Sequence, residues 1–421
     1  MSKENKNILI ISHNPLSRVN NNGKTLVSIF EGVPKENIYQ VYLTSDVPDY
    51  SNECHYLQLN EKQIIGSFLK AKNICCQEIK AISNKVSSAA IKQRSMAINT
   101  KRLLREGIWK IAIWKSRLKE WLKDKSFDIV FFMAGDGMFA YDVYRYIMKN
   151  ISAKGCLFFT DDYILGKTSL SPVALLRRVL LKKKIKKTLK ITKELYVISD
   201  EMKEAYKEIF HFDGCVIRNF SVERIKSESN VQKENSDGLV MVYAGGLHYN
   251  RWKVLSRIAH TLSEINCSGE TKCFLKIYSS QNISKEIIDA VTVDGVSSFM
   301  GGVAASQIAE IYSGADILVH VESFDKKAIA STKYSFSTKI PEYLSAEKCI
   351  LAVGPAEVAS LKYLSDIACT VNNDADFYLE LSKLISDKEY RELIKNQCKG
   401  QYEKDFSREN QKECLRRILS D

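Results

Sequence analysis

Two stretches in the second half of the chain decide its fold. Asp316–Phe324 reads DILVHVESF, and Ser335–Pro355 reads SFSTKIPEYLSAEKCILAVGP. Each contains a short apolar run rich in β-branched residues, and a helical pattern lies between the two runs. An apolar run without polar alternation is typical of a strand buried on both faces of a parallel sheet, and parallel strands are joined by helices. The two stretches therefore predict a strand, a helix and a second strand of an α/β protein.

The same alternation of short apolar runs and longer amphipathic segments continues along the whole chain, so each half is predicted to form its own parallel sheet. The predicted strands are 8–11, 38–43, 129–133, 157–160, 195–198 and 216–217 in the first half and 239–243, 274–278, 297–300, 317–321, 350–353 and 368–371 in the second half.

A chain of 421 residues is too long for one hydrophobic core, because single cores stop growing at roughly 250–300 residues. Val222–Gly238 is polar, charged and without periodicity, which is typical of a linker. We therefore expect an N-terminal domain over 1–225 and a C-terminal domain over 226–400. We expect a helical insertion at about 74–125, where no strand pattern is seen. The last segment, 401–421, is predicted to be helical and either closes the second domain or packs back on the first.

The composition excludes several classes of protein. With 45% hydrophobic and 27% charged residues, 19 Gly and 6 Pro, the chain is neither collagen-like nor of low complexity. Its 11 Cys form no CxxC pair and no metal-ligand spacing, which argues against a disulfide framework and a structural zinc site. No apolar run approaches the length of a membrane span or of a signal segment. We expect a cytoplasmic protein.

The charge of the chain predicts an anionic partner. There are 62 Lys and Arg against 50 Asp and Glu, a net charge of +12. Much of this charge lies in Lys92–Lys125 and Arg177–Lys193, and the second of these segments contains no acidic residue. With Trp109, Trp114 and Trp121 at an interface, these segments would suit an anionic membrane, so that the protein is peripheral at the inner face of the plasma membrane. The alternative is that the lysines face water and the tryptophans pack inside.

Three sequence features are candidate phosphate sites. The first, Asn20–Leu26 (NNNGKTL), lacks the glycine that a P-loop requires where Arg18 stands, so it predicts only a loop after the first strand. The second, Tyr243–Leu255 (YAGGLHYNRWKVL), lies where a strand ends and a helix begins. There Gly245 and Gly246 allow a close approach of an anion, and Arg251 can supply a forked countercharge; an ordinary turn with a solvated arginine is the alternative.

The third feature is the start of the helix in Ser335–Pro355. Ser337 and Thr338 can cap this helix, while its free N–H groups and Lys339 meet a diphosphate. Glu342, one turn into the helix, lies where a carboxylate can bind a ribose diol. Each of these residues alone is common at the start of a helix. The prediction of a nucleotide-diphosphate site therefore depends on their occurring together.

Together these motifs resemble those of GT-B nucleotide-sugar glycosyltransferases, in particular the retaining family 4 (group 1) enzymes of bacterial surface polysaccharide synthesis. Gly245, Leu247 and Arg251 match the family's strand and Gly-x-Leu turn, except that Gly246 stands where the family usually has Arg. Gly302, Val303, Ile311, Tyr312 and Ala315 to Val319 match the stretch that precedes the acidic motif.

Glu322 and Glu342 match the two glutamates of the family's acidic motif, of which the first faces the donor sugar and the second binds the ribose. They lie twenty residues apart instead of the usual eight, and an insert at 325–336 accounts for the difference. The resemblance implies two Rossmann-like domains that face a cleft. It also implies a donor site at Gly245, Gly246, Arg251, Val303, Ser337, Thr338, Lys339 and Glu342, with Glu322 near the reacting sugar.

The resemblance implies a hexosyltransferase-like, retaining enzyme. It would move a sugar from a nucleotide-diphosphate donor to a glycan or lipid-diphosphate-linked acceptor in capsular, exopolysaccharide or O-antigen-type synthesis. No cofactor and no metal are expected, because Asp161 and Asp162 are adjacent and not spaced as in a DxD metal motif.

The first domain offers three candidates near the acceptor. Asp161, in LFFTDDY, stands where the family often has a sugar-pocket histidine, and His13 follows the first strand. Both are predicted catalytic residues. The loop 134–137 (AGDG) either faces the acceptor or is a tight turn.

Two other functions fit the same features. One is a GT-B protein without transfer activity, such as a nucleotide-sugar epimerase. The other is a basic protein that binds a membrane or nucleic acid. No RRM, KH or helix-turn-helix pattern is present, so no specific nucleic acid is expected.

Overall fold

The computed structural model describes residues 6–18, 21–59, 77–78, 95–111, 114–166, 171–220, 238–280 and 282–420. Contacts divide the chain into two compact units. Unit 1 comprises Met1–Asn219 and Gln411–Asp421, and unit 2 comprises Phe220–Asn410. The predicted linker lies outside the described residues except for Gly238, which is the first residue of a strand. Much of the predicted insertion, 74–76 and 79–94, also lies outside them.

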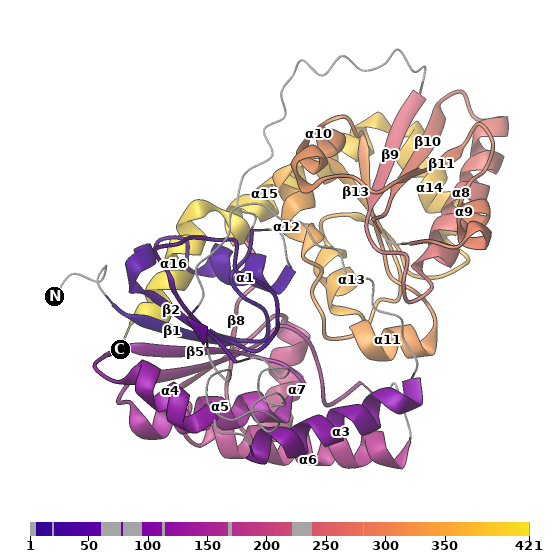
Figure 1. The fold of residues 1–421 in the computed structure, drawn as a ribbon. Coiled ribbons are helices and arrows are strands. Elements are labelled where there is room, and N and C mark those ends of the chain that lie inside the picture. Colours follow the sequence, from indigo (N-terminus) through magenta and orange to yellow (C-terminus); the bar gives the residue numbers. More distant parts are fainter. Residues whose placement is uncertain are drawn as a thin grey trace. The chain divides into compact units, whose positions relative to one another are not determined.

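Unit 1 is built on an eight-stranded sheet (Figure 1). Its strands are, in order across the sheet, β4 (Gln77–Glu78), β3 (His55–Gln58), β2 (Ile38–Tyr42), β1 (Ile8–Ser12), β5 (Ile129–Ala134), β6 (Lys154–Phe159), β7 (Glu194–Val197) and β8 (Cys215–Val216). All neighbouring strands are parallel except β4, which runs antiparallel to β3.

The six strands predicted in this half are confirmed, but β3 and β4 were missed. Strand β3 reads HYLQ, in which polar and apolar residues mix, and β4 is only two residues long. Strand β4 is the edge of the sheet and β3 lies between β4 and β2, and both strands are too short to show a clear side-chain pattern. Strand β4 lies within 74–125, where no strand was expected, whereas 95–111 and 114–122 are helical as expected.

The helices of unit 1 lie on the two faces of its sheet. Figure 1 shows α1 (Asn21–Ile29) on one face and α4 (Trp114–Leu122) and α5 (Met138–Asn150) on the other. The remaining helices are η1 (Lys35–Asn37), α3 (Ser95–Ile111), α6 (Pro172–Leu189) and α7 (Asp200–Phe210). Residues 21–26 form the first part of α1, so the prediction that Asn20–Leu26 is a loop is wrong for them.

The three tryptophans of the basic segment are buried. Trp109 is 3% exposed and Trp114 is 2% exposed, and Trp109 stacks on Phe139 with 4.2 Å between ring centroids. Trp121 is also buried. Of the two alternatives for these side chains, packing inside the unit is correct and an interfacial position is wrong.

Residues 411–421 of the C-terminal segment belong to unit 1, whereas residues 401–410 belong to unit 2. The segment 401–421, predicted to be helical, contains the end of α15 (Lys388–Phe406) and the whole of α16 (Arg408–Leu419), which are separated by the extended residue Ser407. The amide of Gln411 donates to the carbonyl oxygen of Ser28 at 2.5 Å, and Lys154 Nζ donates to those of Ile418 and Ser420. The end of the chain is therefore bonded to residues of unit 1 that lie far away in sequence.

Unit 2 contains a six-stranded parallel sheet. Its order is β11 (Ser297–Gly301), β10 (Lys272–Tyr278), β9 (Gly238–Ala244), β12 (Ile317–Val321), β13 (Cys349–Val353) and β14 (Cys369–Val371). All six predicted strands are confirmed. Besides α15, the helices are α8 (Arg251–Ser268), α9 (Lys285–Val291), η2 (Ala305–Gln307), α10 (Ile308–Ser313), α11 (Lys326–Thr332), α12 (Lys339–Ser345), α13 (Ala359–Leu364) and α14 (Phe377–Ser386).

Each sheet has a point where the strand order reverses. In unit 1 the chain leaves β1 toward β2 and returns on its other side with β5, and in unit 2 it leaves β9 toward β10 and returns with β12. Open parallel sheets bind ligands at such switch points, beyond the carboxyl ends of the strands. The loops that follow β1, β5, β9 and β12 therefore define where a site is expected in each unit.

Candidate functional site

Arg251 and Glu322 join the two loops at the switch point of unit 2. Arg251 is the first residue of α8, after the loop that follows β9, and Glu322 directly follows β12. The guanidinium donates from Nη2 to Glu322 Oε1 at 2.7 Å and from Nε to Oε2 at 3.3 Å. This forked geometry is the one that a guanidinium and a carboxylate form most strongly.

Both partners of this ion pair are removed from water. The side chains of Arg251 and Glu322 are 16% and 4% exposed. Burial raises the pKa of Glu322, and the positive charge of Arg251 opposes that rise. Burial also disfavours the charged form of Arg251, but the carboxylate of Glu322 outweighs this and raises the pKa of Arg251. Each group thus depends on the other for its charge.

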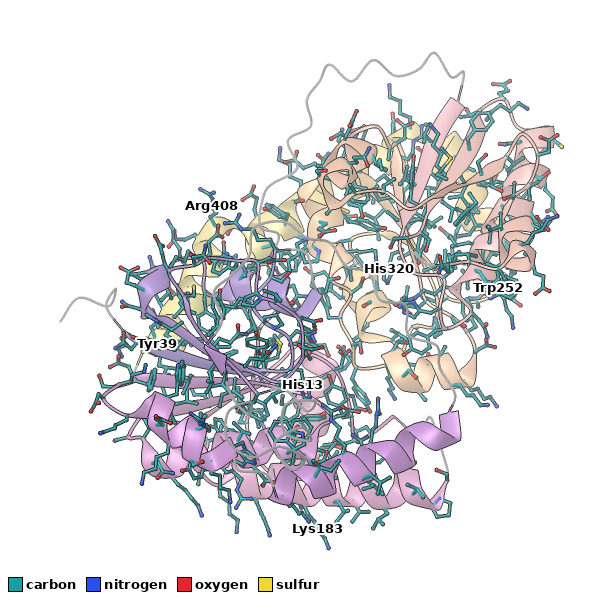
Figure 2. All side chains as sticks on the ribbon, viewed as in Figure 1. His13, Tyr39, Lys183, Trp252, His320 and Arg408 are labelled. Carbon is teal, nitrogen blue, oxygen red and sulfur yellow. The ribbon has the colours of Figure 1, made fainter. Side chains whose placement is uncertain are left out.

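His320 lies beside this ion pair and was not predicted. It is on β12, two residues before Glu322, so both side chains are on the same side of the strand. Its Nε2 is 3.8 Å from Glu322 Oε1 and, among the described residues, has no hydrogen-bond partner. Burial, Arg251 and Lys339 lower the pKa of His320 to about 3, so the imidazole is neutral. Figure 2 shows His320 among the side chains of unit 2.

Gly245 lies close to Tyr243 and Lys339. A Cβ atom at Gly245 would be 2.7 Å from the Tyr243 hydroxyl oxygen and 3.1 Å from Lys339 Cε. The Tyr243 hydroxyl donates to the carbonyl oxygen of Gly246 at 2.7 Å, which fixes the loop after β9. The structure therefore brings Gly245, Gly246, Arg251, Glu322 and Lys339 together around one switch point.

The start of α12 differs in part from the prediction. Ser337 Oγ accepts the N–H of Lys339 at 3.4 Å, as expected for a capping side chain. Thr338 occupies the N-cap position, but its side chain is exposed and forms no capping hydrogen bond, so its predicted capping role is wrong. Its backbone is already helical, which turns the side chain away from the free N–H groups. Glu342 lies in the first turn and is half-buried.

Val303 lies apart from these residues in the sheet order. It follows β11, which is separated from β9 by β10, so it does not belong to the loops at the switch point. The insert between the two glutamates forms α11, as the spacing of twenty residues requires.

His13 occupies the switch point of unit 1. It follows β1, and its ring packs against the glycines that follow β5. A Cβ at Gly135 would be 2.5 Å from His13 Cδ2, and one at Gly137 would be 2.9 Å from Cε1. Glycine is therefore required at both positions for this imidazole to fit. Burial and Arg105 lower the pKa of His13 to about 4 despite the opposing effect of Asp136, so the ring is neutral near pH 7.

Asp136 is held between two arginines that sequence reasoning did not assign to the site. Asp136 Oδ2 is 2.7 Å from Arg102 Nη1 on α3 and 3.1 Å from Arg177 Nη2 on α6. Burial would raise the pKa of Asp136, but these two arginines and His13 lower it below its ordinary value. Only the basic character of the two helices was visible in the sequence. Ala134 is the last residue of β5, and the loop that follows it contacts His13 and is held by the ion pairs of Asp136.

The two aspartates that follow β6 have different positions. Asp162 accepts hydrogen bonds from the backbone N–H groups of Ile164, Leu165 and Gly166 and from the hydroxyl of Tyr206. It therefore stabilises the turn. Asp161 is exposed, so its carboxylate is accessible to a ligand. Within the part of the chain that the structure describes, no group of three or more His, Cys, Asp or Glu is arranged to hold a metal ion.

Solved structures share this architecture over the whole chain. A structure of trehalose-6-phosphate from E. coli bound with UDP-2-fluoro glucose has a TM-score of 0.62 at 8% identity, covering 98% of this chain and 99% of that one. A glycosyltransferase from Rickettsia africae has a TM-score of 0.60 at 12% identity, covering 99% and 100%. The lipopolysaccharide outer core galactosyltransferase WaaB has a TM-score of 0.57 at 11% identity, covering 98% of each chain.

The chain has the GT-B fold. No protein-family model matches the chain. No curated protein matches it either. At these identities the likeness establishes the GT-B architecture, and the assignment of chemistry depends on the residues described above.

Proposed function

We propose that this GT-B protein is a glycosyltransferase of surface polysaccharide synthesis. It takes a sugar from a nucleotide-diphosphate donor and transfers it to a glycan or to a lipid-diphosphate-linked acceptor. The observation that carries this proposal is the ion pair between Arg251 and Glu322 at the switch point of unit 2, with Lys339 beside Gly245. It combines cations for a diphosphate with a carboxylate for a sugar.

The donor is proposed to bind with its diphosphate against Arg251, Lys339 and the N–H groups at the start of α8. Negative charge develops on the diphosphate as the bond to the sugar breaks. Cations that are already in place and shielded from water stabilise that charge without reorganisation. The glycines after β9 leave room for the diphosphate to approach the backbone. Glu342 is proposed to bind the ribose diol.

Glu322 is proposed to position the donor sugar. When the diphosphate binds Arg251, the carboxylate of Glu322 keeps part of its hydrogen bonding and can accept hydrogen bonds from sugar hydroxyls. Retention of the anomeric configuration is part of the proposal, on the strength of the match to the paired-glutamate motif, and no side chain is assigned as a nucleophile.

The acceptor is proposed to bind unit 1 near His13 and Asp161. His13 is neutral and can accept the proton of the attacking hydroxyl, while Asp161 is exposed and can bind hydroxyl groups. Asp136, held by two arginines, lies next to the imidazole and fixes its surroundings. A lipid-diphosphate acceptor would place the protein at the inner face of the plasma membrane.

The deciding experiment is a screen of UDP- and GDP-sugars with a cell-envelope lipid extract as acceptor, read by mass spectrometry. We expect one donor to lose its sugar and one lipid to gain it. Donor turnover without an acceptor would indicate an epimerase or hydrolase. No binding of any nucleotide sugar, with salt-dependent binding of RNA, would favour a nucleic-acid-binding protein.

Two variants connect this activity to the proposed residues. Lys339→Ala should weaken donor binding and slow transfer, and Glu342→Ala should raise the donor KM more than it alters acceptor use. Lys395→Ala, at an exposed position of α15, is the matched control. Full turnover in both site variants would remove these residues from the donor site.

A further inference from the structure

Helix α6 has apolar side chains on two opposite sides. Its inner side is buried in unit 1 through Leu181, Ile185 and Leu189. Its outer side carries four large apolar side chains that remain exposed, namely Leu175 at 43%, Leu176 at 54%, Val179 at 52% and Leu180 at 38%. A helix on the surface of a water-soluble domain normally has a polar outer side. The outer apolar side chains of α6 therefore need a partner.

The exposed residues follow a single stripe along the helix. Residues 175, 176, 179 and 180 are spaced so that they share one side, and the next exposed positions on that side are Lys183, Lys186, Lys187 and Lys190. The stripe is apolar over its first half and basic over its second. Figure 2 shows Lys183 on the outer side of α6, pointing away from the unit.

Helix α3, which neighbours α6, carries a further exposed apolar side chain. It packs alongside α6 (Figure 1), and its Leu104 is 66% exposed. Seven large apolar side chains are exposed in the described part of unit 1, and five of them lie on these two neighbouring helices. Contiguous exposed apolar surface next to charge marks an interaction site more often than scattered single residues do.

We propose that this surface, made of Leu104, Leu175, Leu176, Val179, Leu180 and the four lysines 183, 186, 187 and 190, docks on an anionic lipid bilayer. The leucines and Val179 enter the boundary between headgroups and acyl chains, and the lysines contact anionic headgroups. This inference rests on the proposed function in one respect, because a lipid-linked acceptor is presented at the surface of a bilayer. The Trp side chains that the sequence suggested for this contact have no part in it, since they are buried.

Charge favours a membrane over other occupants. The segment from Arg177 to Lys193 contains no acidic residue. A second copy of the chain would bring the same lysines face to face, and like charges repel. The cores of protein interfaces are depleted in Lys, whereas a bilayer that contains phosphatidylglycerol accepts both the apolar side chains and the positive charge. In the described residues, no helix has the length and apolarity of a membrane span.

The test is co-sedimentation of the full chain with vesicles of phosphatidylcholine alone or mixed with phosphatidylglycerol. We expect binding to the mixed vesicles that weakens as salt is added. The variant Lys183→Gln/Lys186→Gln/Lys187→Gln should bind these vesicles more weakly, by about fivefold for each charge removed, with a smaller salt dependence. Leu176→Gln/Leu180→Gln should also lose binding while keeping its dependence on salt.

Matched controls lie on unit 2. Leu379→Gln removes a side chain that is 66% exposed on α14, and Lys395→Gln/Lys399→Gln removes two exposed charges from α15. Both controls should bind vesicles as the wild type does. Equal losses in controls and α6 variants would overturn the proposal, and so would equal binding to both kinds of vesicle. A dimer in sedimentation velocity that Leu176→Gln dissolves would instead assign the surface to a second copy.

Two further readouts separate this inference from the proposed function. Circular dichroism and thermal unfolding establish that each variant is folded. The thermal shift caused by UDP- and GDP-sugars then reports donor binding in the absence of vesicles. A variant that loses vesicle binding but keeps the thermal shift caused by nucleotide sugars is impaired in membrane docking and not in donor binding. Vesicle binding by a protein that responds to no nucleotide sugar would leave docking supported and the proposed function rejected.

Discussion

Arg251 binds both carboxylate oxygens of Glu322 across 71 residues of sequence, and this one ion pair joins the loops that follow β9 and β12. Two charges that are largely buried stabilise each other here, and each would be unfavourable alone.

This pair should behave as a unit in a double-mutant cycle. Arg251→Met or Glu322→Leu alone is expected to lower the free energy of unfolding by about 3–5 kcal/mol, because each leaves an unpaired buried charge. The double variant should recover most of that loss, yet bind no nucleotide sugar. Urea unfolding measures the free energy of unfolding, and the thermal shift caused by nucleotide sugars measures donor binding. Arg257→Met, which breaks the exposed pair with Asp374, should cost only about 0–1 kcal/mol. Additive losses in the cycle would contradict the coupling.

His320 should make stability depend on pH in acid. Its pKa is about 3 in the folded chain and about 6.5 when unfolded, so the unfolded state binds the extra proton between these values. The contribution of His320 to the free energy of unfolding is therefore most favourable above pH 6.5, and it falls as the pH drops toward 3. His320→Leu removes this contribution, and it also removes an unpaired buried nitrogen. We expect it to unfold at higher urea concentration than the wild type at pH 5, with a smaller difference at pH 8. His260→Leu, at an exposed position, is the control. If His320→Leu and the wild type differed in unfolding midpoint by the same amount at pH 5 and pH 8, His320 would not be the source of the pH dependence.

Gly245→Ala should damage donor binding through a steric contact. Its Cβ would meet the Tyr243 hydroxyl at 2.7 Å and Lys339 Cε at 3.1 Å, so the loop must shift. We expect a loss of about 1–3 kcal/mol in unfolding free energy and a higher donor KM. Tyr243→Phe combined with Gly245→Ala should recover part of the stability, because the clashing oxygen is gone. Gly400→Ala, with no neighbour within 4 Å, is expected to be neutral or slightly stabilising. If Gly245→Ala matched this control in stability and KM, the steric argument would fail.

His13 should control the acid side of the pH profile of transfer. Because its pKa is about 4, it is in the neutral form above pH 5, and its capacity to accept a proton is lost as the pH falls through 4. His13→Gln should lower kcat/KM by about 10²–10⁴-fold and abolish that acid limb. Initial rates over a pH series measure both effects, with His260→Gln as the control. A variant that retains the acid limb would show that another group produces it.

The central strands β12 and β13 of unit 2 were predictable because they are buried on both faces. Apolar runs such as 317–321 stand out from the polar sequence around them, and β12 has those same bounds. Strands β3 and β4 could not be predicted, since they have only four and two residues, and β3 mixes polar and apolar side chains. The break at Ser407 was equally invisible, because the charged helical pattern runs through it.

The residues of the candidate site were predictable one at a time, but their relationships were not. Gly245, Arg251 and Glu322 lie at strand ends, where parallel sheets bind ligands. The sequence assigned Arg251 to a diphosphate and Glu322 to a sugar, with no indication that they bind each other. Contacts between Asp136 and Arg177, on separate elements, depend on how the whole unit folds.

The attachment of α16 to unit 1 has a consequence for synthesis of the protein. Lys6 and Lys154 donate to backbone carbonyl oxygens of residues 418–420, and the side chain of Leu415 lies against Gly32. Residues 411–420 are synthesised after the whole of unit 2. Lys6 and Lys154 therefore acquire these partners only at the end of translation, so unit 1 cannot complete its packing before unit 2 has been made.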